Sequence, residues 1–293
     1  MSPRSKALFD PVRRVFFLAA LLTAAVGLGR EASRPAPKFL ESNPDQAEGA
    51  RVLGGFREAG IAGDYWLQFE LRVMPRRGPE RTLRGEILGQ PGPAGPQTRL
   101  QVAAPGAPEL RYLLHGGSRP QAWRQEADAS LRSLDAAEWL EPLAGTDLTV
   151  FDLQMPFLRW TDFVFEGVAN VRGRPAHAFL LYPPADFAPA TPARPAPAAV
   201  RVYLDTQFSA PTQAEWVGPD GRVLKSVTVL DLKKAGEQWL VKSIDLRNPV
   251  TRDKTRFQVT AAALDLDWPE LAFQPEGLAS PSPTVPEDRI RRF

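Results

Sequence analysis

The side chains that could carry catalysis are few and lie far apart in the sequence. The 293-residue chain has two histidines, His115 and His177, and no cysteine. Each histidine falls in a predicted strand and has no partner at the spacing of a metal ligand. The pattern Gly-x-Ser-x-Gly, which marks the nucleophilic serine of many hydrolases, does not occur. These features predict histidines at the surface or in hydrogen bonds, no catalytic residue and no metal site.

The acidic residues form only loose pairs, such as Asp265 with Asp267 and Asp64 with Glu70. Two carboxylates on one strand face could serve acid–base chemistry. The alternative is that such a pair solvates the end of a strand. A glycine-rich phosphate loop is also missing, since Gly116-Gly117 is typical of a turn. We therefore predict that the protein is not an enzyme and needs no cofactor.

The composition argues against nucleic acid as a partner. The 36 basic and 34 acidic residues nearly balance, which leaves a formal charge of +2. No basic cluster interleaved with aromatic residues is present, so the sequence predicts no nucleic-acid partner. The apolar fraction of 43% is enough to bury a core, and the 30 prolines suit the loops of an antiparallel fold.

The N-terminal residues have the pattern of an export signal. Four basic residues, Arg4, Lys6, Arg13 and Arg14, precede an apolar run over residues 15–29 that only Thr23 interrupts. A positive start followed by an apolar stretch of this length is typical of a secretory signal. We expect residues 1–32 to be a signal peptide or an uncleaved membrane anchor, followed by a spacer over 33–42. Either form places the rest of the chain outside the cytoplasm.

Residues 43–275 predict one mainly β domain. A helix is expected with Asn43 as its cap and Pro44 at its first position, and it is expected to end near Gly60. Residues 65–73 alternate well, with Tyr65 and four aliphatic or aromatic residues on one side and Trp66 with three polar residues on the other, as in a half-buried strand. Turns such as Gly218-Pro219-Asp220-Gly221 separate the later strands and indicate an antiparallel meander over residues 198–273. The fold class predicted is a strongly curved antiparallel sheet of about eleven strands, an open or incomplete β-barrel covered by the N-terminal helix and short helical lid segments.

Two segments depart from the strand pattern. Residues 130–140 and 147–153 are predicted to form short helices or irregular structure, and a compact apolar patch follows them. Four residues of this patch are the lid candidates: Met155, Phe157, Leu158 and Trp160. Residues 276–293 are predicted to be a disordered tail.

One face of the predicted sheet is apolar and carries no chemistry. If side chains do not fill the space that this face encloses, it is a cavity for an apolar ligand. If they fill it, the protein has an ordinary core and no ligand there. The residues predicted to line the cavity are Leu67, Phe69, Leu71, Leu83, Ile87, Leu100, Val102, Tyr112, Leu114, Phe179, Leu181, Val202 and Leu204.

Residues 145–273 contain several motifs that follow the pattern of one protein family. They include the runs Val202-Tyr203-Leu204-Asp205, Gly218-Pro219-Asp220-Gly221-Arg222-Val223-Leu224-Lys225 and Gly236-Glu237-Gln238-Trp239-Leu240. Val171-Arg172-Gly173-Arg174-Pro175 is similar to a family hairpin, although His177 stands near the usual aromatic residue. In another family strand a proline is common where this chain has Val241 or a neighbour. Over these residues the chain resembles the LolA-like family of outer-membrane lipoprotein-sorting proteins.

The resemblance implies an open half-barrel of about eleven strands with a helical lid, which binds lipid or acyl chains without catalysis. On this basis the protein is predicted to be a periplasmic carrier or chaperone for the acyl chains of lipoproteins or lipids, acting in outer-membrane lipoprotein sorting. An envelope membrane protein complex is a possible partner. The alternative is a sensor module that binds a protein partner with the same sheet. A third hypothesis is a secreted hydrolase that uses His115 or His177.

Overall fold

The computed structural model describes residues 39, 43–57, 60–126, 128–187, 196–208 and 210–293. The predicted signal or anchor over residues 1–32 lies outside this part of the chain. Among the described residues, no helix combines the length and apolar character needed to cross a bilayer.

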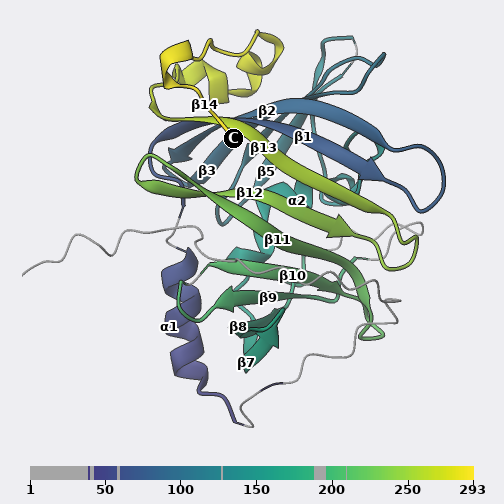
Figure 1. Ribbon diagram of the computed structural model, residues 1–293, viewed down its shortest axis with the longest axis vertical. Coiled ribbons are helices and arrows are strands. Elements are labelled where there is room, and N and C mark those ends of the chain that lie inside the picture. Colours follow the sequence, from purple (N-terminus) through teal and green to yellow (C-terminus); the bar gives the residue numbers. More distant parts are fainter. Residues whose placement is uncertain (1–38, 40–42, 58–59, 127, 188–195, 209) are drawn as a thin grey trace, which may run out of the picture.

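The prediction of a mainly β protein is confirmed. Fourteen strands form one antiparallel sheet, rather than about eleven (Figure 1). The strands are β1 (Asp64–Met74), β2 (Arg81–Gly92), β3 (Gly95–Ala103), β4 (Leu110–His115), β5 (Gln121–Gln125), β6 (Leu131–Ser133), β7 (Phe163–Val171), β8 (Arg174–Leu181), β9 (Ala199–Asp205), β10 (Pro211–Val217), β11 (Val223–Ala235), β12 (Gln238–Arg247), β13 (Lys254–Leu266) and β14 (Arg291–Arg292). The helices are α1 (Gln46–Arg57) and α2 (Val150–Gln154), with six 3-10 turns between or after strands in the described residues.

The sheet is open, with β6 and β7 at its two edges. Its order is β6-β5-β4-β3-β2-β1-β13-β12-β11-β10-β9-β8-β7, and β14 adds to β13. Most neighbours are joined by short turns. The pairing of β1 with β13 instead joins the start of the domain to its end, in the middle of the sheet. This pairing ties two series of hairpins into one sheet.

The two faces of the sheet are covered by different parts of the chain. The inner face carries Leu67, Phe69 and Leu71 of β1, and it packs against residues 134–160, which we call the cover segment. The outer face carries Trp66 of the same strand, and it packs against residues 267–293, which we call the C-terminal segment. The alternation in β1 therefore serves two cores, one on each side.

The C-terminal segment corrects the prediction of a disordered tail over residues 276–293. It contains 3-10 turns at Pro275–Ala279 and Glu287–Arg289, and Arg291 and Arg292 pair with β13. Leu278 is fully buried on the outer face. Its apolar residues are too few and too widely separated by prolines and charges to give a periodic signal, and they are ordered only because a tertiary surface receives them.

The helix α1 lies beside the β7 edge rather than over the sheet (Figure 1). The side-chain amide of Gln46 exchanges two hydrogen bonds with the backbone of Phe165, donating at 2.8 Å and accepting at 2.9 Å. This satisfies edge groups that would otherwise face solvent or another chain. Leu53 and Phe56 of the helix enter the inner core.

Candidate functional site

All thirteen residues predicted to line a cavity lie on the inner face and belong to one apolar cluster. None of their side chains is more than 9% exposed. They come from β1, β2, β3, β4, β8 and β9, which spread across both wings of the sheet. Whether they line a ligand cavity remains a prediction, but the continuous apolar surface it requires is present.

Aromatic side chains of the cover segment pack against this surface. Phe151 of α2 lies at the centre of the cluster, with its ring centroid 4.9 Å from that of Trp216 on β10 and 5.5 Å from that of Phe157. Phe187 lies 5.6 Å from Phe151 and 5.4 Å from Trp160. These rings occupy the inner face where α2 crosses it.

The four lid candidates all belong to the cover segment. Phe157 and Trp160 are buried in the inner core, and Leu158 is partly buried against it. Met155 is 40% exposed and adopts a left-handed backbone conformation where α2 ends, with φ of 46°. It therefore faces away from the core that its three neighbours enter.

A buried ion pair fastens the cover segment to the sheet. Thr149 caps α2, and Asp152 completes the capping box by accepting from the Thr149 backbone at 2.8 Å. The carboxylate of Asp152 also pairs with the ammonium group of Lys225 on β11, which lies 4.2 Å from the Trp216 ring centroid. Burial raises the pKa of Asp152, while Lys225 and Thr149 oppose that rise.

Further polar contacts hold the middle of the cover segment. Just before α2, the hydroxyl of Thr255 donates to Asp147 at 2.9 Å, and the Arg81 guanidinium donates to the Gly145 carbonyl. Burial raises the pKa of Asp147, against the opposing effect of that hydroxyl. Towards its end, the Gln154 amide donates to the Gln121 carbonyl at 2.6 Å. Polar bonds thus define where an otherwise apolar segment sits.

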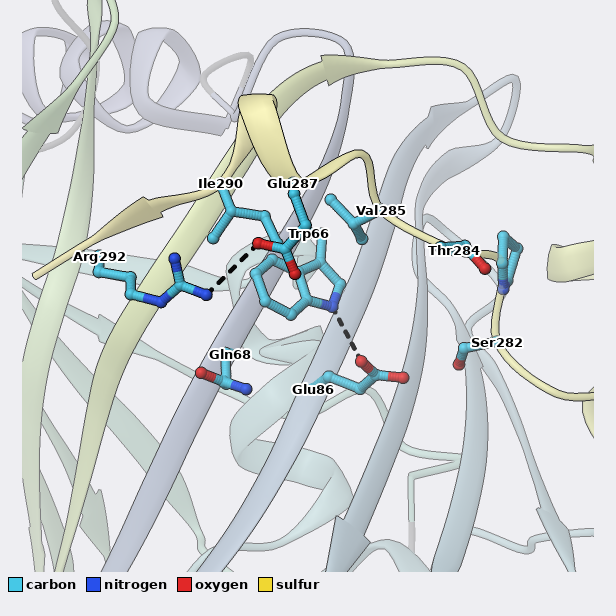
Figure 2. Close-up of a pocket in the computed structure, with 10 residues that line it drawn as sticks. Trp66, Gln68, Glu86, Ser282, Thr284, Val285, Glu287, Ile290 and Arg292 are labelled. Carbon is cyan, nitrogen blue, oxygen red and sulfur yellow. Dashed lines mark hydrogen bonds and ion pairs between the residues drawn. The ribbon is translucent and has the colours of Figure 1, made fainter.

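A second candidate site lies on the outer face, beneath the C-terminal segment (Figure 2). It is a pocket of about 300 Å³ between β1, β2 and residues 282–292. Trp66, Gln68 and Glu86 come from the sheet, and the indole of Trp66 donates to Glu86 at 2.9 Å. The sequence did not predict this pocket, because residues 276–293, which include its roof, were expected to be disordered. The available signal was Trp66, a large aromatic residue on the otherwise polar side of β1.

The two histidines lie on β4 and β8, as predicted. His115 shares a hydrogen bond of 2.9 Å with the Phe273 carbonyl and meets the Trp123 ring edge-on. His177 lies beside the Phe165 ring, with centroids 5.7 Å apart. Within the described ranges, no three His, Asp or Glu side chains gather closely enough to hold a metal ion.

Known proteins share parts of this sequence pattern and this architecture. A family model described only as an uncharacterized protein matches residues 129–280, just over half of the chain. A putative outer-membrane lipoprotein-sorting protein domain from Vibrio parahaemolyticus has a similar structure, with a TM-score of 0.68 at 14% identity over 80% of this chain and 100% of that one. The chain belongs to the matched family and has the LolA-like fold.

Two further structures share this LolA-like fold. A DUF1329 family protein from Desulfovibrio piger gives a TM-score of 0.67 at 14% identity, covering 79% of this chain and 98% of that one. A LolA superfamily protein from Nitrosomonas europaea gives 0.60 at 13% identity, covering 76% and 96%. No curated protein matches the sequence significantly.

Proposed function

We propose that this LolA-like protein is a periplasmic carrier or chaperone that binds the acyl chains of lipoproteins or lipids on its inner face, in outer-membrane lipoprotein sorting. This proposal rests on the continuous apolar surface of thirteen buried residues, which the cover segment closes. Burial of an acyl chain on such a surface contributes about 0.8 kcal/mol per methylene group, so a few chains give useful affinity without any catalytic group.

The shape proposed is a half-barrel, and the position of α2 supports it. This helix lies against β4, while its Phe151 ring meets Trp216 on β10. The two strands are seven steps apart in the sheet order. In a flat sheet that separation would be roughly 34 Å, at about 4.8 Å per strand. A helix of five residues spans far less, so contact with both strands favours a sheet that bends around it.

An acyl chain reaches the middle of the inner face only when the cover segment moves. The aromatic rings of Phe151, Phe157 and Trp160 now occupy that position. Their apolar contacts with the sheet would be replaced by contacts with the ligand. The polar contacts of Asp152 and Asp147 have no such replacement, and they set the free energy that the ligand must offset.

Bromine quenches tryptophan fluorescence at short range, which gives a direct test. Trp160 and Trp216 belong to the inner core, whereas Trp66 and Trp268 belong to the outer one. Titration with dibrominated stearic acid should give saturable quenching, and unbrominated stearic acid should not. Trp160→Phe should reduce the quenching, because it removes a tryptophan of the inner core. Trp66→Phe should leave the quenching of the inner-core tryptophans unchanged. Absence of saturable quenching would reject the carrier.

The alternative, an envelope sensor module that binds a protein partner with the same sheet, is favoured by one observation. The cover segment already buries its own aromatic residues on the inner face, as a permanent core would. A partner would then dock elsewhere on the sheet with no lid movement. Affinity capture from periplasmic extract separates the two functions: co-purified lipid supports the carrier, and one stoichiometric protein without lipid supports the sensor.

A further inference from the structure

The pocket beneath the C-terminal segment lies on the opposite face of the sheet from the proposed acyl site. Its floor is formed by Trp66 and Gln68 of β1 and Glu86 of β2, with Gln68 and Glu86 directly opposite each other in the strand register (Figure 2). Its roof is formed by residues 282–292, including Ser282, Thr284 and Val285. A volume of about 300 Å³ is at the small end of the range that ligand pockets occupy.

The pocket contains one carboxylate outside any ion pair of the described residues. Glu86 accepts a hydrogen bond from the Trp66 indole. The second carboxylate, Glu287, lies 3.5 Å from the guanidinium of Arg292. Arg99, the buried cation on the strand beside Glu86, attracts Glu86 electrostatically but directs its hydrogen bonds to the carbonyls of Gly277 and Leu278. The hydrogen-bonding capacity of the Glu86 carboxylate is therefore not taken up by a cation.

The other groups in the pocket suit a donor-rich ligand. The hydroxyl of Ser282 is buried in the roof with no hydrogen-bond partner among the described residues. Gln68 adds an amide oxygen on the floor. The ring of Trp66 provides the aromatic surface that attracts organic cations. An ammonium group has three donors and no acceptor, which matches a carboxylate, a hydroxyl and an amide oxygen.

We propose that this pocket binds an organic ammonium group, with Glu86 as its counter-ion, Trp66 as its aromatic contact and Ser282 as an additional acceptor. The shared chemistry of the ligand is a primary amine, carried either by a free small molecule or by a lipid headgroup. The site is independent of the acyl-binding function, because its residues come from the outer face.

The chain allows a residue-specific test. It has seven tryptophans, so indole-labelled full-length protein should give seven indole N–H signals in a nitrogen–proton spectrum, and Trp66→Phe identifies the signal of Trp66. Titration with ethanolamine should shift this signal saturably, and equal concentrations of glycerol should not. A second titration uses glycerophosphoethanolamine, which carries the same amine as part of a lipid headgroup. Tighter binding of this compound than of ethanolamine indicates a headgroup, and equal or weaker binding indicates a free amine.

Glu86→Gln keeps the shape of the side chain and removes its charge, so the affinity for ethanolamine should fall roughly tenfold, as expected for the loss of one charge-assisted contact. Glu70→Gln is the matched control, because Glu70 lies on the outer face of β1, pairs with Arg84 and does not line the pocket. A Trp66 signal that does not shift, that shifts equally with glycerol, or that responds equally in Glu86→Gln would overturn the proposal and leave a pocket filled by water.

Discussion

At the scale of single residues, Gly49 decides how closely α1 approaches the sheet. A Cβ atom at this position would lie 2.5 Å from the Cβ and Cγ atoms of Phe165. Phe165 is also the residue whose backbone bonds to Gln46. One glycine and one glutamine thus fix the helix against the β7 edge, and the apolar stripe of α1 alone does not specify this position.

Gly49→Ala should therefore weaken the domain by about 1–3 kcal/mol, as overpacking does, against a gain of up to about 1 kcal/mol from helix propensity. The matched control is Gly55→Ala in the same helix, where nothing lies within 4 Å of the added Cβ atom. That variant should be neutral or more stable. Urea denaturation of both variants measures the difference, and equal stabilities would contradict the contact.

A second residue, Arg99, holds the C-terminal segment. It is 1% exposed, and besides its bonds to Gly277 and Leu278 it donates to the Ser280 carbonyl. Burial lowers the pKa of this guanidinium, followed in effect by the nearby charge of Arg111. The residue remains charged at neutral pH because arginine titrates far above it.

Arg99→Met should leave these carbonyls without donors and release the C-terminal segment locally, at a cost of about 1–3 kcal/mol. Hydrogen exchange should quicken over residues 268–293 and stay unchanged in β7 to β10. Arg84→Met serves as the control, because Arg84 is exposed on the outer face and pairs with Glu70. Faster exchange throughout the sheet, or none in the C-terminal segment, would contradict the assignment.

At the scale of elements, the cover segment depends on the ion pair between Asp152 and Lys225. Their side chains are 3% and 9% exposed. Removing one member of a buried pair leaves the other charge without compensation, which typically costs about 3–5 kcal/mol. Replacing both members by neutral residues of similar size costs far less.

Lys225→Met should show this cost with a defined pH dependence. Burial already raises the pKa of Asp152, and loss of Lys225 raises it further. The native state then keeps a proton that the unfolded state releases above about pH 4, so its unfolding free energy falls as the pH rises through this window. Relative to wild type, the deficit should be larger at pH 7.5 than at pH 4.5.

Urea denaturation at the two pH values measures this effect. Asp152→Asn combined with Lys225→Met should recover most of the stability at pH 7.5. A deficit in Lys225→Met that is equal at both pH values, or larger at pH 4.5, would show that Asp152 is not the group left uncompensated.

The elements also show what the sequence could predict. The alternation of residues 65–73 correctly placed Leu67, Phe69 and Leu71 on the inner face, because a half-buried strand leaves a period of two. Residues 131–133 gave no such signal, and their pairing as β6 depends on the neighbouring β5. The C-terminal segment was missed for the same reason, since its order comes from Arg99 and the outer face rather than from local propensity.

At the scale of the whole molecule, both faces of one sheet are occupied. The inner face supports the proposed carrier function, and the thirteen inner residues could be named from alternation alone. The outer pocket could not be predicted from the sequence, because Glu86 and Ser282 are 196 positions apart and only the fold brings them together. The LolA-like motifs identified the fold, but they carry no information about the outer pocket.

The central claim is that acyl chains reach the inner face when the cover segment moves, and a reversible lock tests it most directly. The chain has no cysteine, so Asp147→Cys combined with Thr255→Cys places the only two thiols where side chains of the cover segment and β13 hydrogen bond at 2.9 Å. The control pair is Gln90→Cys with Gln97→Cys, which are opposite each other in the β2–β3 hairpin.

The measurement is saturable binding of dibrominated stearic acid to each protein, oxidised and then reduced. We expect the oxidised Asp147–Thr255 pair to lose binding and to regain it on reduction, while the Gln90–Gln97 pair binds in both states. Binding that persists in the locked protein, or that is absent from the wild type, would contradict the account.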